Sequence, residues 1–273
     1  MVTKITELPS MRCAIWGMEG TWKSSKALSF PKPIVHFDID VGGFNRATWA
    51  NLPTPRVDLD GITSKSYVIP IGMERLVGAK AGPTVRFPKK VTGYRETWQE
   101  IIVDFVTACQ DKSVKSIIMD SATGLWEICH KSLLQEKQEI QLAQNPRLAD
   151  ADLRERLQPV EFPNDRMSQL IYTAQSMDKN LIMIHYPKDE YAGDQKTGKQ
   201  IIDGFKHTEK IVDVVFYTEL KQDKDKNWAA TAKITTKCGY PGLGTDALGM
   251  ELPSPDYQGI IDLYKLINGI EEE

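Results

Sequence analysis

The chain has 273 residues, of which 41% are hydrophobic and 26% are charged, a composition typical of soluble globular proteins. A formal net charge of -3 argues against a uniformly basic nucleic-acid-binding protein, although a local basic patch is compatible with it. The four cysteines (Cys13, Cys109, Cys129 and Cys238) form no CxxC pair, so they favour reduced intracellular thiols over a disulfide framework or a zinc site. The sequence shows no signal peptide and no run of 18 apolar residues, so we expect no contact with a membrane and a cytoplasmic location.

The stretch from Met11 to Phe30 predicts a strand, a short loop and the start of a helix. The loop reads GMEGTWKSS and approaches the phosphate-binding pattern G-x-x-x-x-G-K-[ST]. Backbone N–H groups at the start of such a helix bind phosphates, Lys23 would contact the β- and γ-phosphates, and the Ser24 hydroxyl would bind magnesium. The predicted nucleotide-binding residues are Gly17, Met18, Glu19, Gly20, Thr21, Trp22, Lys23, Ser24 and Ser25.

Trp22 departs from this pattern because it stands where the last glycine belongs. Its side chain must point away from the phosphates, and its backbone must adopt angles that glycine accepts more easily. The alternative is an ordinary strand, turn and helix that contains a Lys-Ser pair by chance.

A second short strand, from Ile34 to Asp40, ends in Asp38 and Asp40. Carboxylates at the end of a strand beside the phosphate-binding loop lie where ligands bind in parallel α/β sheets. The alternative is that both aspartates serve the turn that precedes the two following glycines.

Residues 51–95 are irregular and contain five prolines, with one short strand expected at Tyr67–Ile71. The part from Lys80 to Arg95 carries five basic residues, no acidic residue, and two interleaved aromatic side chains. Such a loop could bind single-stranded DNA through phosphate contacts and base stacking. The alternative is a solvated surface insertion. The candidate DNA-binding residues are Arg86, Phe87, Lys89, Lys90, Tyr94 and Arg95.

Two later strands also end in polar residues. A helix over Trp98–Cys109 precedes the strand Val114–Ser121, where Asp120 is placed to hold a magnesium ion beside the loop. The strand Asn180–His185 ends in His185, which is either a sensor of the γ-phosphate or a structural histidine.

The rest of the pattern predicts one α/β domain over residues 1–273, with 51–95 as an irregular basic insertion and 241–273 as a C-terminal extension. Residues 186–210 read as a charged loop with a hairpin turn near Asp194–Lys199. The remaining predicted elements are the helices Ala122–Gln144, Asn164–Lys179 and Tyr257–Ile267 and the antiparallel strands Ile211–Leu220 and Trp228–Thr236.

The order of these motifs resembles phage-encoded RecA-like P-loop ATPases of the AAA type, the recombinase or single-strand-annealing group. The resemblance rests on GMEGTWKSS, HFDID followed by VGG, IIMDS, LIMIHY and the closing hairpin with its lysine. It implies a RecA-like fold, with a mostly parallel central sheet flanked by helices and a C-terminal β-hairpin. It further implies ATP and Mg²⁺ as cofactors, a homo-oligomeric ring or filament on single-stranded DNA, and phage recombination or replication in the infected host's cytoplasm, with other phage proteins as further partners.

By this resemblance Lys23 and Ser24 form the phosphate-binding pair, and Asp120 is the carboxylate of the magnesium site. Asp40 stands where the family has a glutamate that activates water, His185 stands at the sensor position, and Lys237 would project into the neighbouring subunit's site. Asp40 is one methylene shorter than glutamate, so the rate of hydrolysis is left open. The alternatives are a nucleotide-dependent annealing module with little turnover, a replicative helicase or helicase loader, and, less favoured, a small-molecule kinase.

Overall fold

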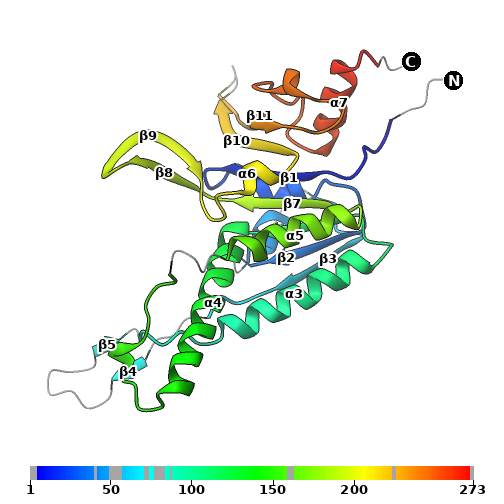
Figure 1. The fold of residues 1–273 in the computed structure, drawn as a ribbon. Coiled ribbons are helices and arrows are strands. Elements are labelled where there is room, and N and C mark those ends of the chain that lie inside the picture. The colour runs from blue at the N-terminus through cyan, green and yellow to red at the C-terminus, as the bar shows by residue number, and fades with distance from the viewer. Residues whose placement is uncertain are drawn as a thin grey trace.

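The computed structural model describes residues 5–39, 42–48, 57–70, 74–76, 84–86, 88–158, 163–222 and 226–270. Its centre is a seven-stranded sheet with the order β11-β10-β1-β7-β6-β2-β3 (Figure 1). Neighbouring strands run parallel except β11, which is antiparallel to β10. This is the mostly parallel α/β sheet with a C-terminal antiparallel pair that the sequence predicts. The strands are β1 (Arg12–Gly17), β2 (Ile34–Asp38), β3 (Ile62–Ser66), β6 (Ser116–Asp120), β7 (Asn180–His185), β10 (Val214–Gln222) and β11 (Trp228–Cys238).

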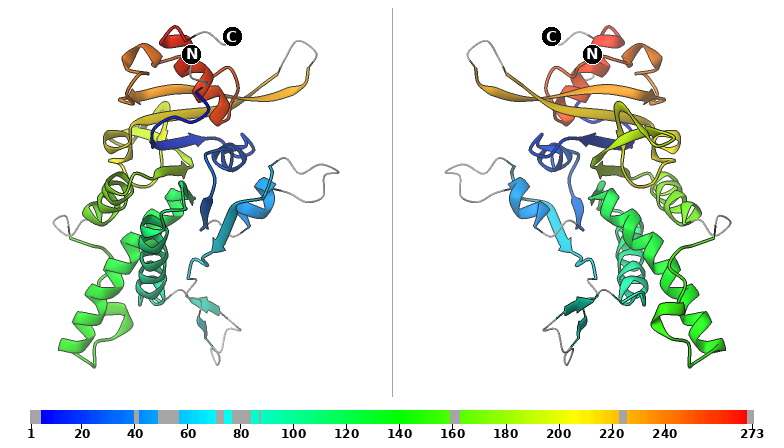
Figure 2. Two further views of the ribbon diagram at one scale, coloured as in Figure 1. Left: turned by 90° about the vertical axis from the view of Figure 1, so that its right-hand side faces the viewer. Right: turned by 90° about the vertical axis from the view of Figure 1, so that its left-hand side faces the viewer.

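Helices cover both faces of the sheet (Figures 1 and 2). One face packs against α3 (Tyr94–Gln110), α4 (Ala122–Gln144) and α5 (Asn164–Ser176). The other packs against α1 (Lys23–Ala27) and α7 (Tyr257–Ile267). We call these the α4 face and the α1 face. Two further short helices are α2 (Gly43–Thr48) and α6 (Thr208–Ile211), and single 3-10 turns lie at Asp150–Asp152 and Thr245–Ala247.

The central strands are buried on both faces, which explains their continuous apolar runs. Every residue of β6 and β7 is buried. Because side chains alternate along a strand, Ile117 and Met119 pack on the α4 face while Ile118 packs on the α1 face. Each such side chain contributes about 1.5–3 kcal/mol when it is removed from water. Asp120, the next residue, therefore falls on the α1 face at the end of its strand.

Two hairpins extend away from the central sheet (Figure 1). One consists of β8 (Pro187–Ala192) and β9 (Gln195–Ile202), and the other of β4 (Glu74–Leu76) and β5 (Thr84–Arg86). The turn of the first hairpin lies at residues 193–194, at the start of the predicted turn, but its two strands were not predicted. Their residues are mostly polar and exposed, so they lack the apolar alternation by which strands are recognised.

Two expectations about the sheet are wrong. The strand β2 is not beside the phosphate-binding strand β1, because β7 and β6 lie between them. The short strand expected at Tyr67–Ile71 lies earlier, at Ile62–Ser66, where Ile62 is the only aliphatic residue. Tyr67 follows it with a buried ring, and its N–H donates to the carbonyl of Asp38. No helix in the described part of the chain is long and apolar enough to cross a membrane.

Candidate nucleotide-binding site

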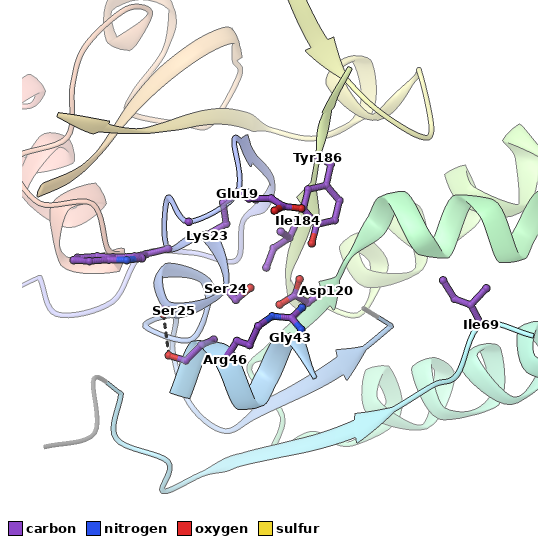
Figure 3. A pocket seen from close by; sticks show the side chains of 13 residues that line it. Glu19, Lys23, Ser24, Ser25, Gly43, Arg46, Ile69, Asp120, Ile184 and Tyr186 are labelled. Atoms are coloured by element: carbon purple, nitrogen blue, oxygen red, sulfur yellow. Dashed lines mark hydrogen bonds between the residues drawn. The ribbon is translucent and has the colours of Figure 1, made fainter. Parts of the chain in front are cut away.

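A cavity of about 800 Å³ lies at the edge of the sheet where the parallel strands end. It is bordered by the loop after β1, by α2, and by the ends of β6 and β7 (Figure 3). Ligands bind in this position in open parallel α/β sheets. Lys23, Ser24 and Asp120, which the sequence predicts for one site, all line this cavity.

The loop from Gly17 to Lys23 is held against the neighbouring strand β10. The side-chain hydroxyls of Thr21 and Thr218 lie 2.7 Å apart. Gly17 has a φ of 152°, and a Cβ there would lie 2.2 Å from the Thr218 carbonyl oxygen, so only glycine fits. The Nζ of Lys23 donates to the carbonyls of Gly17 and Met18, each at 2.8 Å. The loop thus curls around its own lysine at the mouth of the cavity.

Trp22 has the glycine-like backbone that its place in the pattern requires. Its φ of 61° and ψ of 29° lie in the left-handed region, which costs a residue with a side chain roughly 1–2 kcal/mol. The residue is 42% exposed, so Trp22 is not part of the core. The strained backbone conformation therefore lies directly before Lys23, which lines the cavity.

The carboxylates of Asp38 and Asp120 are neighbours, because β2 and β6 pair in register at these residues. Asp38 accepts from the Gly43 N–H at 3.1 Å and from the Ser66 hydroxyl at 3.3 Å. The ring Nε2 of His36 lies 3.4 Å from Oδ2 of Asp120. Asp38 therefore holds the start of α2 in place, while Asp120 faces the cavity.

The sequence analysis does not predict several residues that line the cavity, among them Arg46 and Tyr186. Arg46 reaches from α2 toward Asp120 (Figure 3), and the Nζ of Lys23 lies 5.1 Å from the centre of the Tyr186 ring. The six-residue α2 begins at Gly43, the second of two glycines, and is too short to show a helical periodicity, so no sequence pattern predicted Arg46. Alternation along β7 is the signal that could have found Tyr186, two residues after the cavity-lining Ile184.

His185 lies on the α4 face of the sheet, outside this cavity. Its side chain is fully buried, and its Nδ1 lies 3.0 Å from the carbonyl oxygen of Asp203. Because a carbonyl can only accept, Nδ1 carries the proton, and Nε2 has no hydrogen-bond partner within the described residues. Burial lowers the pKa of His185 to about 4. Strand alternation, which brings Ile184 and Tyr186 to the cavity, turns His185 away from it.

The predicted catalytic set has two other members, Asp40 and Lys237. Asp40 lies outside the described residues. Lys237 is near the end of β11 that pairs with the start of β10, and its Nζ donates to the Lys210 carbonyl at 2.6 Å. Thr218, beside the loop, pairs with Ala232, five residues earlier on β11, which places Lys237 roughly 17 Å further along the sheet. Any contact of Lys237 with a nucleotide site would have to be with another subunit's site.

Acidic residues from a distant segment of the chain lie against the predicted DNA-binding stretch. Lys89 pairs with Glu155, and the backbone N–H groups of Lys89 and Lys90 donate to the carboxylate of Asp150. The local sequence lacks acids, but a distant segment of the chain supplies them.

The two residues at the start of α3 are also engaged within the protein. Arg95 pairs with Glu96 and Glu139. Tyr94 is only 7% exposed, and its hydroxyl accepts from Lys131 at 3.2 Å, so Tyr94 presents no face on which a base could stack. Arg86 ends β5, and Phe87 lies outside the described residues.

The donor set of the cavity fits a nucleoside triphosphate with Mg²⁺. An ammonium group and an arginine are suited to phosphate, while a hydroxyl and a carboxylate are oxygen ligands of the kind magnesium takes. The backbone of Gly43 lies close to both carboxylates, since a Cβ on this residue would lie 3.1 Å from Asp38 Oδ1 and 3.5 Å from Asp120 Oδ2. Magnesium usually keeps several waters and one or two carboxylates, so Ser24 and Asp120 suffice on the protein side.

Comparison with known proteins agrees with this geometry. Residues 10–242 match the family model described as an AAA domain, and this range begins just before β1 and ends after β11. None of the curated proteins compared with the chain matches it. The chain therefore belongs to the AAA-domain family and is a P-loop protein of the AAA type.

Proposed function

We propose that this protein binds ATP with Mg²⁺ in the cavity beside the P-loop, hydrolyses the ATP, and acts on single-stranded DNA in phage recombination or replication. The observation that carries the nucleotide part is the convergence of Lys23 and Ser24, at the start of α1, with Asp120, at the end of β6, on one cavity. These residue types, in a fold of the AAA family, support phosphate and magnesium binding. The DNA part rests on the sequence resemblance.

Hydrolysis needs a group that orients the attacking water. Asp40 is the candidate that the resemblance supplies, and Glu19 is a second candidate because it lines the cavity from the loop itself (Figure 3). Magnesium, when bound, would neutralise charge on the phosphates. Lys23 would exchange its contacts with loop carbonyls for a phosphate oxygen.

The test of nucleotide binding compares Lys23→Ala with Lys112→Ala, which removes an exposed lysine near the opposite edge of the sheet. Removing a buried charged partner costs about 2–5 kcal/mol, so Lys23→Ala should weaken ATP binding by about 30-fold or more. The control should bind as the parent does. Titration calorimetry measures both, after circular dichroism has confirmed folding. Equal affinity of Lys23→Ala and the parent would refute the site.

The DNA surface is better sought on the hairpin β8–β9 than on the Lys80–Arg95 stretch. The hairpin follows β7 directly at the cavity, and its exposed residues include Tyr191 and Lys199. We therefore pair Tyr191→Ala with Lys199→Glu in one variant and Lys89→Glu with Lys90→Glu in a matched second variant. Fluorescence anisotropy across a salt series should show weaker binding and a flatter salt slope for the hairpin variant. If only the Lys89 and Lys90 variant lost binding, the DNA surface would be the basic stretch after all.

A second candidate function is a nucleotide-dependent annealing module with little turnover. Asp40 is shorter than the glutamate of the resembling family, which favours slow hydrolysis. Measuring phosphate release with and without single-stranded DNA separates the two. Turnover that DNA stimulates supports the ATPase, whereas ATP binding without turnover supports the annealing module. Electron microscopy with DNA and an ATP analogue would show whether the proposed oligomer is a ring or a filament.

A further inference from the structure

A second hollow adjoins the nucleotide cavity on the other side of α1. It has a volume of about 360 Å³ and is lined by Trp22, Ser25, Lys32, Asp58, Pro255 and Asp256, among others. We call it the Trp22 groove. Trp22 and Ser25 line both the groove and the cavity, so the two spaces adjoin at the start of α1. The groove therefore begins beside the cavity, next to the same two residues.

The groups that suit phosphate and magnesium are on the cavity side only. Lys23, Ser24 and Asp120 line the cavity but not the groove. The groove has two lysines, and both are already engaged with protein oxygens: Lys26 Nζ donates to the Thr231 carbonyl at 3.3 Å, and Lys32 Nζ contacts Asp58 at 2.7 Å. The groups that suit a triphosphate are therefore in the cavity, and the groove offers space for an uncharged part of the same ligand.

The groove instead has the features that a nucleoside needs. The carboxylates of Asp58 and Asp256 can accept hydrogen bonds from ribose hydroxyls or from an exocyclic amino group. Asp58 already accepts from Lys32 Nζ, but a carboxylate has about four lone pairs and can accept further bonds. Asp256 is fixed in place because its Oδ1 caps α7, accepting from the Gly259 N–H at 3.0 Å and the Ser254 hydroxyl at 2.6 Å. Carboxylates repel phosphate, which reinforces the direction of the ligand.

Trp22 supplies a large aromatic surface at the junction. Trp22 is 42% exposed, although its backbone adopts a left-handed conformation that glycine would adopt without strain. A strained aromatic residue at a ligand site is explained if the ring itself contacts the ligand.

We propose that the Trp22 groove binds the nucleoside part of the nucleotide, with a purine base stacked on Trp22 and hydrogen-bond donors directed at Asp256 and Asp58. This proposal rests on the proposed function, since it extends the same nucleotide from its triphosphate to its base. In this proposal Trp22 selects the base of the nucleotide, and this role explains why a tryptophan stands where the phosphate-binding pattern has its last glycine.

The test measures binding of ATP and of inorganic tripolyphosphate, both with Mg²⁺, by titration calorimetry. Trp22→Gly removes the ring and also relieves the backbone, so the variant is expected to fold. Trp22→Phe keeps an aromatic face, and Trp228→Ala is the control, since it removes an exposed tryptophan on β11. Stacking predicts that Trp22→Gly loses about 5- to 150-fold in ATP affinity with tripolyphosphate unchanged. Trp22→Phe should keep most of the ATP affinity, and CTP should bind the parent more weakly than ATP.

The outcomes separate this proposal from the one on which it rests. If the parent binds tripolyphosphate and ATP equally, or if Trp22→Gly leaves their ratio unchanged, the groove is not the nucleoside site although the P-loop assignment stands. If the parent binds neither ligand, the proposed function fails and the groove proposal fails with it. Equal losses for ATP and tripolyphosphate in Trp22→Gly would also overturn stacking, because they would show that the ring only shapes the loop.

Discussion

The buried His185 should make the protein less stable in mild acid. Burial lowers its pKa from the ordinary value of 6.5 to about 4. Between these values the unfolded chain binds a proton that the folded chain does not, so stability falls as the pH drops from about 7 to about 4 and then levels off. The gap corresponds to about 3 kcal/mol, a large share of the 5–15 kcal/mol that stabilises a typical domain.

The assay compares the parent with His185→Asn by urea unfolding at several pH values between 4 and 8. The asparagine amide can replace Nδ1 as donor to the Asp203 carbonyl but takes up no proton. The cavity left by the smaller side chain costs the same at every pH, so only the pH-dependent part of the difference reports on His185. We expect the variant to gain about 3 kcal/mol relative to the parent between pH 7 and pH 4. A difference in stability that stays constant across this range would refute a buried, neutral His185.

Three further outcomes follow from the structure. Burial lowers the pKa of Lys26 to about 8, so Lys26→Met should stabilise the fold by about 1–2 kcal/mol at pH 7. Denaturant titration should show that this stabilisation disappears above about pH 10.5. Gly17→Ala places a methyl group 2.2 Å from a carbonyl of β10 and should lower the thermal midpoint strongly, whereas Gly20→Ala meets nothing within 4 Å and should cost only about 1 kcal/mol of left-handed strain. If Lys237 completes a neighbour's site, mixing Lys237→Ala with Lys23→Ala protein should restore part of the ATP turnover; no recovery in co-assembled mixtures would exclude that role.

The sequence predicts the sheet well because its central strands can be recognised from their apolar residues alone. Buried parallel strands are continuous apolar runs, and these runs predict the bounds of β6 and β7 to within two residues. The long helix Ala122–Gln144 was predicted with its observed bounds for the same reason, since many turns repeat one periodicity. Exposed elements such as β8 and β9 carry no such signal, because their residues do not contact the core.

The sequence predicts the candidate site best where the motif is local, and it carries less information where the interacting residues are distant along the chain. The motif GMEGTWKSS forms its loop from consecutive residues, and the structure places Lys23 and Ser24 at the cavity. The charge balance around Lys89 is set instead by Glu155, which lies 66 positions away along the chain. A basic run in a sequence shows the charge of a segment, while the charge of a surface depends on which acids the fold brings beside it.

The sheet also explains why strand ends alone do not identify a nucleotide site. Asp120 and His185 both end neighbouring parallel strands, so both reach the edge where ligands bind. Yet the register pairs Asp120 with Ile184, and His185 is one residue further along, on the opposite side of the pleat. The helix α1 and its loop cover only one face, and a polar side chain must be at the edge and on that face to meet a phosphate. Counting residues from the buried Ile118 and Ile182, which share the α1 face, would have assigned Asp120, Ile184 and Tyr186 to the site and His185 to the core.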